Sequence, residues 1–235
     1  PCGTRYLFTR VAVATAQALS RRGGVTPLKS GCCGLLAFNY GELEDARAFA
    51  KKAIEAAEAD PAKPIVVDCS SCAAFLKSYE QLFLADVAWR GRSRTFAGRI
   101  RDAVEVFDGG GISLETMTYH QSCRACHGQG LGQPAAFKAA SRPLEEADAC
   151  CGGAGAFSFT HPELSEEILL RKISKIAATQ AKVVVTSSTS CLIQLARGLK
   201  KYYPSCTVQH ISEIATFSDG EAPLKGSSYG PQTGA

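Results

Sequence analysis

The tripeptide Cys-Cys-Gly occurs twice in this 235-residue chain, at residues 32–34 and 150–152, and no other feature constrains the fold as strongly. Other cysteines recur at nearly the same offset, between 118 and 121 residues. The recurring pairs are Cys2 and Cys123, Cys32 and Cys150, Cys33 and Cys151, and Cys72 and Cys191. A fixed internal period is the signature of a duplicated structural unit, so we expect a chain built from two related halves.

The hydrophobic pattern of both halves alternates between short strands and amphipathic helices. Strands are predicted at residues 65–67, 116–119, 183–185 and 207–211, and helices over residues 11–21, 42–58, 73–84, 133–140, 163–179 and 192–201. This order favours an α/β fold: two pseudo-repeated small parallel-sheet (Rossmann-like) units with flanking helices. We place the first repeat at residues 1–95, the second at 96–216, and a flexible tail rich in Gly, Ser and Pro at 217–235.

The composition of the chain limits which cellular compartment and which classes of binding partner we expect. No signal peptide is visible in the given sequence, and no apolar run reaches the length of about 20 residues that could span a membrane. A net charge of +4 gives no reason to expect a nucleic-acid partner. The arginine-rich segment 89–101 is either a solvated linker or helix face or a docking surface for an anionic partner. Eleven cysteines without a secretory signal favour a reducing, cytoplasmic setting, where clustered thiols are metal ligands or redox groups.

The cysteines themselves favour an iron–sulfur group over zinc. Most of them follow a predicted strand or precede a predicted helix, where ligands of open α/β sheets collect. Zinc normally takes four ligands, whereas the first half alone offers five: Cys2, Cys32, Cys33, Cys69 and Cys72. Adjacent cysteines chelate one small ion awkwardly but can reach two irons of a larger cluster. A zinc-stabilised interaction module remains the alternative.

The spacing also resembles a known family. The chain has 29 residues between Cys2 and the Cys-Cys-Gly, and 35 residues between Cys33 and the Cys-x-x-Cys that begins at Cys69. This spacing resembles the cysteine-rich CCG domain, from Cys2 to about residue 214. Duplicated CCG domains occur in one of the subunits of heterodisulfide reductase. They also occur in the iron–sulfur subunits of glycolate oxidase, of the lactate-utilisation system and of anaerobic glycerol-3-phosphate dehydrogenase. The resemblance implies one or two [4Fe-4S] clusters, the first of which would be noncubane if it follows the heterodisulfide reductase pattern.

The second half departs from the five-cysteine pattern, because Ser188 stands where the first cysteine of its Cys-x-x-Cys should be. Its expected ligands are Cys123, Cys150, Cys151 and Cys191, with Cys126 as either a weaker fifth candidate or an unligated thiol. The second site can therefore hold a four-ligand cubane, hold zinc, or be empty. His120 is a candidate for hydrogen bonding to a cluster sulfur or for moving a proton, and is otherwise a structural histidine. Cys206 is expected to be unligated.

Two functions follow from the resemblance. "YHQSC", "CCGGAGAFSF" and "VVVTSSTSC" are similar to the glycolate and lactate type. That type implies an iron–sulfur electron-transfer subunit of a flavin-linked 2-hydroxy-acid oxidoreductase complex. Its partners would be a flavin-containing dehydrogenase subunit and other iron–sulfur subunits, with a peripheral membrane or quinone contact. "VVDCSSC" instead resembles the disulfide reductase, which uses a noncubane cluster. The strand expected before Cys2 and a ferredoxin-like CxxCxxCxxxCP segment are missing, so we expect either a fragment or another subunit in that role.

Overall fold

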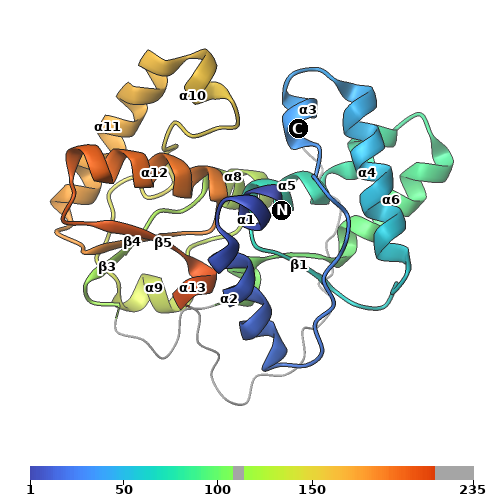
Figure 1. The fold of residues 1–235 in the computed structure, drawn as a ribbon, viewed down its shortest axis with the longest axis horizontal. Coiled ribbons are helices and arrows are strands. Elements are labelled where there is room, and N and C mark those ends of the chain that lie inside the picture. Colours follow the sequence, from blue (N-terminus) through green and yellow to red (C-terminus); the bar gives the residue numbers. More distant parts are fainter. Residues whose placement is uncertain (108–113, 215–235) are drawn as a thin grey trace.

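Two small parallel sheets organise residues 1–107 and 114–214, the part of the chain that this computed structural model describes. The first sheet pairs β1 (Ile65–Val67) with β2 (Ile100–Asp102). The second has the order β3-β4-β5, with β3 (Met117–Tyr119), β4 (Val183–Thr186) and β5 (Thr207–His210). The sheets lie in two lobes that meet at the centre of the molecule (Figure 1). The predicted α/β class is confirmed.

Among the described strands, β2 is the one that the sequence analysis did not identify, and several helices, including the one directly before β2, were also not predicted. Strand β2 lies in the polar arginine-rich segment, yet both Arg101 and Asp102 are buried. The Arg101 guanidinium donates hydrogen bonds to the carbonyl oxygens of Gly98 and Ile100, and the Asp102 carboxylate accepts one from the Val104 backbone N–H. Because these polar groups are satisfied locally, the strand needs no apolar pattern. The sheet of the first half thus extends beyond residue 95, and the proposed boundary there stays a prediction.

The helices of the first half surround β1 and β2. They are α1 (Cys2–Tyr6), α2 (Thr9–Ser20), α3 (Leu35–Asn39), α4 (Leu43–Glu58), α5 (Ser70–Lys77), the 3₁₀ helix η1 (Tyr79–Phe83), α6 (Val87–Arg99) and α7 (Ala103–Val106). Helices α2 and α4 lie where they were predicted. The single helix expected over 73–84 is divided into α5 and η1, because the chain leaves the helical conformation at Ser78, whose hydroxyl donates to the Phe75 carbonyl oxygen.

The arginines of α6 are bonded within the chain. Glu80 pairs with both Arg90 and Arg94, and Glu58 accepts two hydrogen bonds from Arg92. The Arg92 guanidinium also lies 3.8 Å from the centre of the Trp89 ring. These contacts support the helix-face interpretation of the arginine-rich segment.

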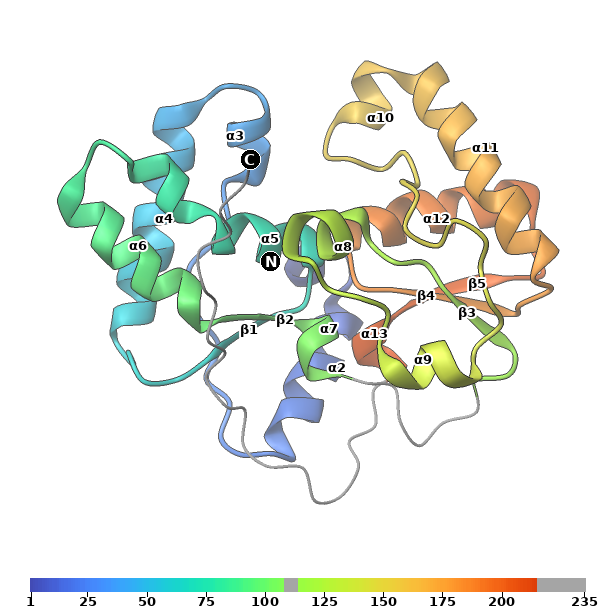
Figure 2. The same cartoon turned by 180° about the vertical axis from the view of Figure 1, so that it is seen from behind.

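The helices of the second half repeat the arrangement around β4 and β5, as Figure 2 shows from behind. They are α8 (Cys123–Gln129), α9 (Ala135–Ala140), α10 (Phe157–Thr160), α11 (Pro162–Ala178), α12 (Thr189–Tyr202) and α13 (Ile211–Ile214). Helices α9, α11 and α12 match the predicted ones. Among the described residues, no helix combines the length and the apolar character needed to cross a bilayer. The predicted tail, 217–235, lies outside the described residues.

The two halves join through the starts of equivalent helices. Helix α5 packs against α8, and α1 packs against α12. The Ser70 backbone N–H donates to the Ser187 carbonyl oxygen at 2.9 Å, and the two hydroxyls are 2.7 Å apart. A Cβ added at Gly3 would lie 2.6 Å from Thr189 Oγ1, so α1 and α12 approach as closely as a glycine allows. The segments that follow β1 and β4 therefore face each other at the centre.

Candidate metal centre

The glycine of each Cys-Cys-Gly has the same backbone conformation and the same contact. Gly34 and Gly152 have φ angles of +82° and +81°, in the left-handed region that glycine adopts freely. Their backbone N–H groups point at the preceding cysteines, 3.4 Å from Cys32 Sγ and 3.3 Å from Cys150 Sγ. The tripeptide is thus a turn in which a peptide N–H donates to a sulfur, built once in each half.

Five cysteines converge in the first half, and we call them the first sulfur cluster: Cys2, Cys32, Cys33, Cys69 and Cys72. They come from α1, from the turn before α3, and from the residues that follow β1. The sulfurs of Cys33 and Cys72 are 3.3 Å apart. Hydrogen bonds also join Cys32 to both Cys2 and Cys33, and Cys69 to Cys72. The five sulfurs therefore form one continuous chain of contacts.

Proton sharing divides the first sulfur cluster into acidic and non-acidic thiols. Hydrogen bonds from Cys2 and Cys33 lower the pKa of Cys32 to about 2. The hydrogen bond from Cys72 likewise holds the pKa of Cys69 well below its usual range. The hydrogen bond to Cys32 raises the pKa of Cys33 to about 12. Deprotonating all five thiols would bring anions into contact, so the full set of thiolates requires a multivalent cation.

Aromatic and hydroxyl side chains enclose the buried end of this cluster. The Tyr79 hydroxyl donates to the Cys33 carbonyl oxygen at 2.6 Å, and Tyr79 is fully buried. The Phe75 ring packs edge-on against the Tyr79 ring, with the two ring centres 5.4 Å apart. Thr189, from the other half, places its Oγ1 3.2 Å from Cys69 Sγ. Sequence reasoning missed this contact, and its one available signal was the position of Thr189 two residues before Cys191.

Four cysteines converge in the second half, and we call them the second sulfur cluster: Cys123, Cys150, Cys151 and Cys191. Hydrogen bonds from Cys123 and Cys151 lower the pKa of Cys150 to about 2, as in the first half. The hydrogen bond from Cys151, together with the nearby imidazole of His120, keeps the pKa of Cys191 well below its usual range. The four sulfurs are therefore also connected.

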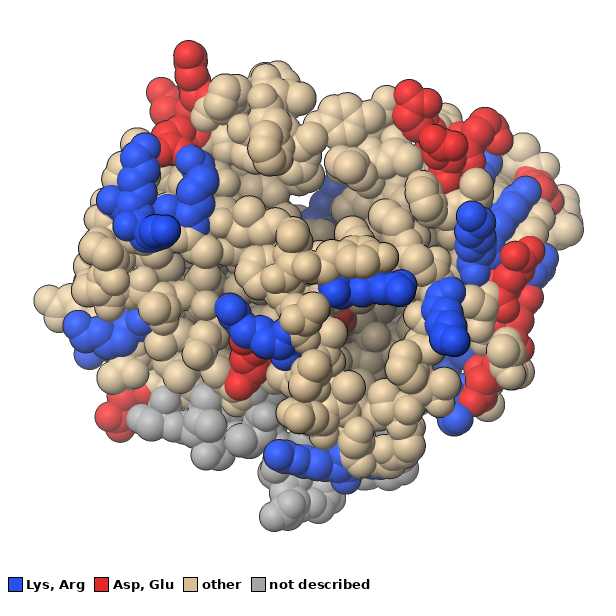
Figure 3. All heavy atoms as spheres, viewed as in Figure 1, with Lys and Arg blue, Asp and Glu red and all other residues tan. Residues whose placement is uncertain are grey.

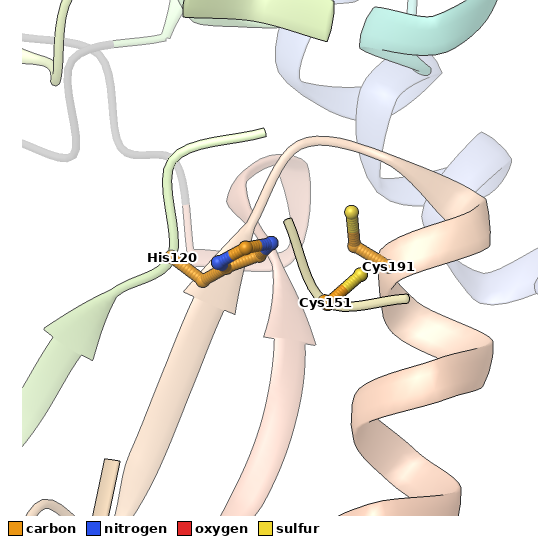
Figure 4. A group of neighbouring side chains, drawn as sticks. All are labelled: His120, Cys151 and Cys191. Carbon is orange, nitrogen blue, oxygen red and sulfur yellow. The ribbon is translucent and has the colours of Figure 1, made fainter. Parts of the chain in front are cut away.

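His120 and Ser188 distinguish the second site from the first. His120 follows β3 and is fully buried, and neither ring nitrogen has an oxygen or nitrogen partner among the described residues, while its ring interacts with the Cys191 thiol. A ring nitrogen and the sulfurs of Cys151 and Cys191 all lie within 4.8 Å of one another (Figure 4). The Ser188 hydroxyl lies 2.8 Å from Ser71 Oγ, at the junction of the halves.

The other two cysteines have different surroundings. Cys126 offers its sulfur within 4.8 Å of ligand atoms of His127 and Asp148, near the surface. Cys206 is 3 % exposed in an apolar cluster beside α12, where burial raises its pKa to about 11.

The donor sets of both sulfur clusters fit a thiophilic metal group. Thiolates bind zinc or iron–sulfur clusters rather than hard cations such as magnesium. The first sulfur cluster has one sulfur more than a tetrahedral zinc ion uses, which favours an iron–sulfur group there. The second has four sulfurs and an orphaned imidazole at the same place.

Comparison with known proteins agrees with this geometry. The profile of the CCG cysteine-rich domain matches residues 1–77 and 117–196. The chain is 32 % identical to "Lactate utilization protein A" of Exiguobacterium sp. over 230 residues, covering 91 % of this chain and 93 % of that protein. It is 31 % identical to the "Probable glycolate oxidase iron-sulfur subunit" of Bacillus subtilis, covering 84 % of this chain and 48 % of that protein. It is also 29 % identical to the "Uncharacterized protein YkgE" of Escherichia coli, covering 80 % and 84 % of the two chains. The chain therefore belongs to the cysteine-rich CCG-domain family and carries the domain twice.

Proposed function

We propose that this chain is the iron–sulfur electron-transfer subunit of a flavin-linked 2-hydroxy-acid oxidoreductase complex of the glycolate or lactate type. The observation that carries the proposal is the contiguous arrangement of five sulfurs in the first half, with a second set of four at the equivalent place. The names of the relatives support an oxidoreductase-related, iron–sulfur role. The flavin subunit, the other iron–sulfur subunits, a cytoplasmic location and a peripheral membrane contact belong to the proposal.

In this function the first and second sulfur clusters hold the metal groups, which accept and release single electrons. The first group would be a [4Fe-4S] cluster held by five cysteines, and the second would be held by at least four. Cys126, which lies beside His127 and Asp148, is left out of this ligand set. The backbone N–H groups of Gly34 and Gly152 donate to ligand sulfurs. Such hydrogen bonds stabilise negative charge on the sulfur and favour the reduced state.

The surface supplies an edge at which electrons can leave or enter. Cys2 and Cys150 are the exposed members of their clusters. The face between the lobes is hollowed near α3 and α10, and mostly uncharged residues line its rim (Figure 3). Leu36 of α3 is 51 % exposed and Phe159 of α10 is 85 % exposed. An apolar rim beside a redox group suits the docking of a protein partner.

One observation favours a second function, that of a disulfide reductase. The first half keeps both cysteines of its Cys-x-x-Cys, and its five sulfurs exceed what a simple relay needs. A reductase would deliver two electrons and two protons to a bound disulfide and release two thiols. Turnover of a mixed disulfide with a reduced viologen as the electron donor distinguishes the functions, because a relay subunit has no activity in this assay.

The first experiment is anaerobic analysis of iron and acid-labile sulfide, combined with electron paramagnetic resonance (EPR). Iron and sulfide in equal amounts, about four or about eight of each per chain, would support the proposal. Zinc without sulfide would contradict it.

A pair of cysteine variants tests the ligand assignment. Both Cys33 and Cys206 are buried thiols, 9 % and 3 % exposed, so replacing either one by alanine removes a similar buried group. We expect Cys33→Ala to lose the iron and the EPR signal of the first site and to unfold at a lower temperature, because metal binding contributes to folding. Cys206→Ala should keep its full iron content. Equal iron in both variants would show that the assignment is wrong.

A further inference from the structure

We infer that His120 is a nitrogen ligand of the metal group at the second sulfur cluster, supplying the fifth ligand that Ser188 does not provide. The inference rests on the proposed function, in which this cluster holds an iron–sulfur group. It assigns the second site a mixed set of four sulfurs and one imidazole, whereas the first site has sulfur alone.

The environment of His120 is that of a side chain with a missing partner. The residue is fully buried, and neither ring nitrogen has an oxygen or nitrogen partner among the described residues, while its ring interacts with the Cys191 thiol. Buried polar groups are otherwise almost always satisfied, so an orphaned imidazole needs an explanation. His210, at the end of β5, differs at one nitrogen: its Nδ1 lies 3.1 Å from Ser212 Oγ and accepts the Ser212 backbone N–H, and only its Nε2 lacks a partner among the described residues.

The imidazole is also aimed at the second sulfur cluster. A ring nitrogen lies within 4.8 Å of the sulfurs of Cys151 and Cys191, which are 2 % and 4 % exposed. Figure 4 shows the ring between its strand and these two sulfurs. Ligand atoms of one metal ion lie within about twice a metal–ligand distance of 2.0–2.3 Å of one another, and ligands of different metal ions in one cluster lie further apart.

The hydrogen bonds of the Ser188 hydroxyl lead to the junction of the halves. Ser188 occupies the sequence position equivalent to Cys69, but its hydroxyl lies 2.8 Å from Ser71 Oγ and 3.1 Å from Ser190 Oγ. Its contact with a sulfur is to Cys69 of the other half, at 3.9 Å. The serine is thus part of a hydroxyl network at the junction, and His120 approaches the cluster from a different strand.

An imidazole ligand changes the electronics of the second site. A neutral imidazole in place of a thiolate removes one negative charge from the ligand set, which raises the reduction potential of an iron–sulfur group. The second site would therefore be the better electron acceptor of the two.

The test is pulsed EPR on the reduced, full-length protein, after iron and sulfide analysis. In the protein of unmodified sequence we expect a strong nitrogen hyperfine coupling to the reduced metal group. Labelling the protein with ¹⁵N-histidine should change this coupling, which would identify histidine as its source. That coupling should disappear in His120→Cys, which keeps a ligand at this position, while iron and sulfide are retained and the second potential falls. His127→Ala, at a histidine whose side chain is 63 % exposed, and Ser188→Ala should keep the coupling.

The iron and sulfide analysis tests the proposed function, and the EPR measurements test the assignment of His120 as a ligand. Absence of iron and sulfide would defeat the proposed function. Iron and sulfide without a histidine-derived coupling would overturn the assignment of His120 and leave the proposed function standing. Retention of the coupling in His120→Cys, or its loss in Ser188→Ala, would also overturn the assignment.

Discussion

Replacing Gly152 by alanine is the sharpest test of the Cys-Cys-Gly geometry. An alanine at φ +81° adopts the left-handed conformation, which is unfavourable by about 1–2 kcal/mol. Its Cβ would also lie 2.7 Å from the Ser165 carbonyl oxygen of α11, so the backbone must shift. Overpacking of this kind adds about 1–3 kcal/mol. We expect a total destabilisation of about 2–5 kcal/mol and, since the shifted N–H no longer reaches Cys150, a loss of metal from the second site.

Gly41→Ala is the matched control, because Gly41 has a φ of +83° and an added Cβ would have no atom within 4 Å. This variant should show the conformational effect alone. The assay is thermal unfolding of the anaerobically purified protein, with iron content measured on the same samples. For a chain of this length each kcal/mol corresponds to about 2–4 °C. If Gly152→Ala were no less stable than Gly41→Ala and kept all its iron, the role of close packing at Gly152 would be refuted.

Three further predictions concern the first half. Burial raises the pKa of Asp102 to about 6. The protonated side chain therefore contributes its full share to the free energy of unfolding below about pH 4, the pKa range of an unfolded aspartate. We expect the free energy of unfolding to fall by about 2–3 kcal/mol as the pH rises through 6. In unfolding curves measured at several pH values, Asp102→Asn should remove this dependence. Tyr79→Phe leaves the buried Cys33 carbonyl oxygen without its 2.6 Å donor and should lower the free energy of unfolding by about 1–3 kcal/mol; an unchanged value would contradict this role. The Arg99 guanidinium donates to three carbonyl oxygens in the last turn of α4 and the segment after it, so Arg99→Lys should lower the unfolding temperature, whereas Arg99→Ala should lower it further.

Many of the strands and longer helices could be predicted because the two patterns that reveal them, short apolar runs and helical periodicity, are local in the sequence. Strand β1 lies at the predicted residues, and β4 extends only one residue further. These segments are short apolar runs bounded by polar residues, which is the pattern that buried parallel strands require. Helices α4 and α11 were equally visible from their periodicity. Strand β2 was not visible, since Arg101 and Asp102 are buried through contacts that only the folded chain creates.

The candidate site was predictable in its cysteines but not in their contacts. The repeat spacing singled out the cysteines that the fold brings together, and it singled out Ser188 as a departure. It could not show that the Ser188 hydroxyl faces Ser71 of the other half, because that contact joins residues 117 positions apart. The sequence also could not decide between a structural and a functional His120. That choice depends on whether the folded core offers the ring a partner.

The junction of the two halves suggests a physical reason why Ser188 stands where the repeat would place a cysteine. Cys69 and Ser188 are equivalent residues, and their side chains lie against each other with Sγ and Oγ 3.9 Å apart. A symmetric duplication would place two cysteine sulfurs there. Two such thiols could oxidise to a disulfide, whose sulfurs need only close to about 2 Å, and either sulfur would then be lost to its own cluster. A serine at one of the two positions keeps Cys69 available to the first sulfur cluster and supplies a hydroxyl beside it. The second half would then complete its ligand set from elsewhere, and the buried imidazole that follows β3, within 4.8 Å of the sulfurs of Cys151 and Cys191, is the donor that we propose for it.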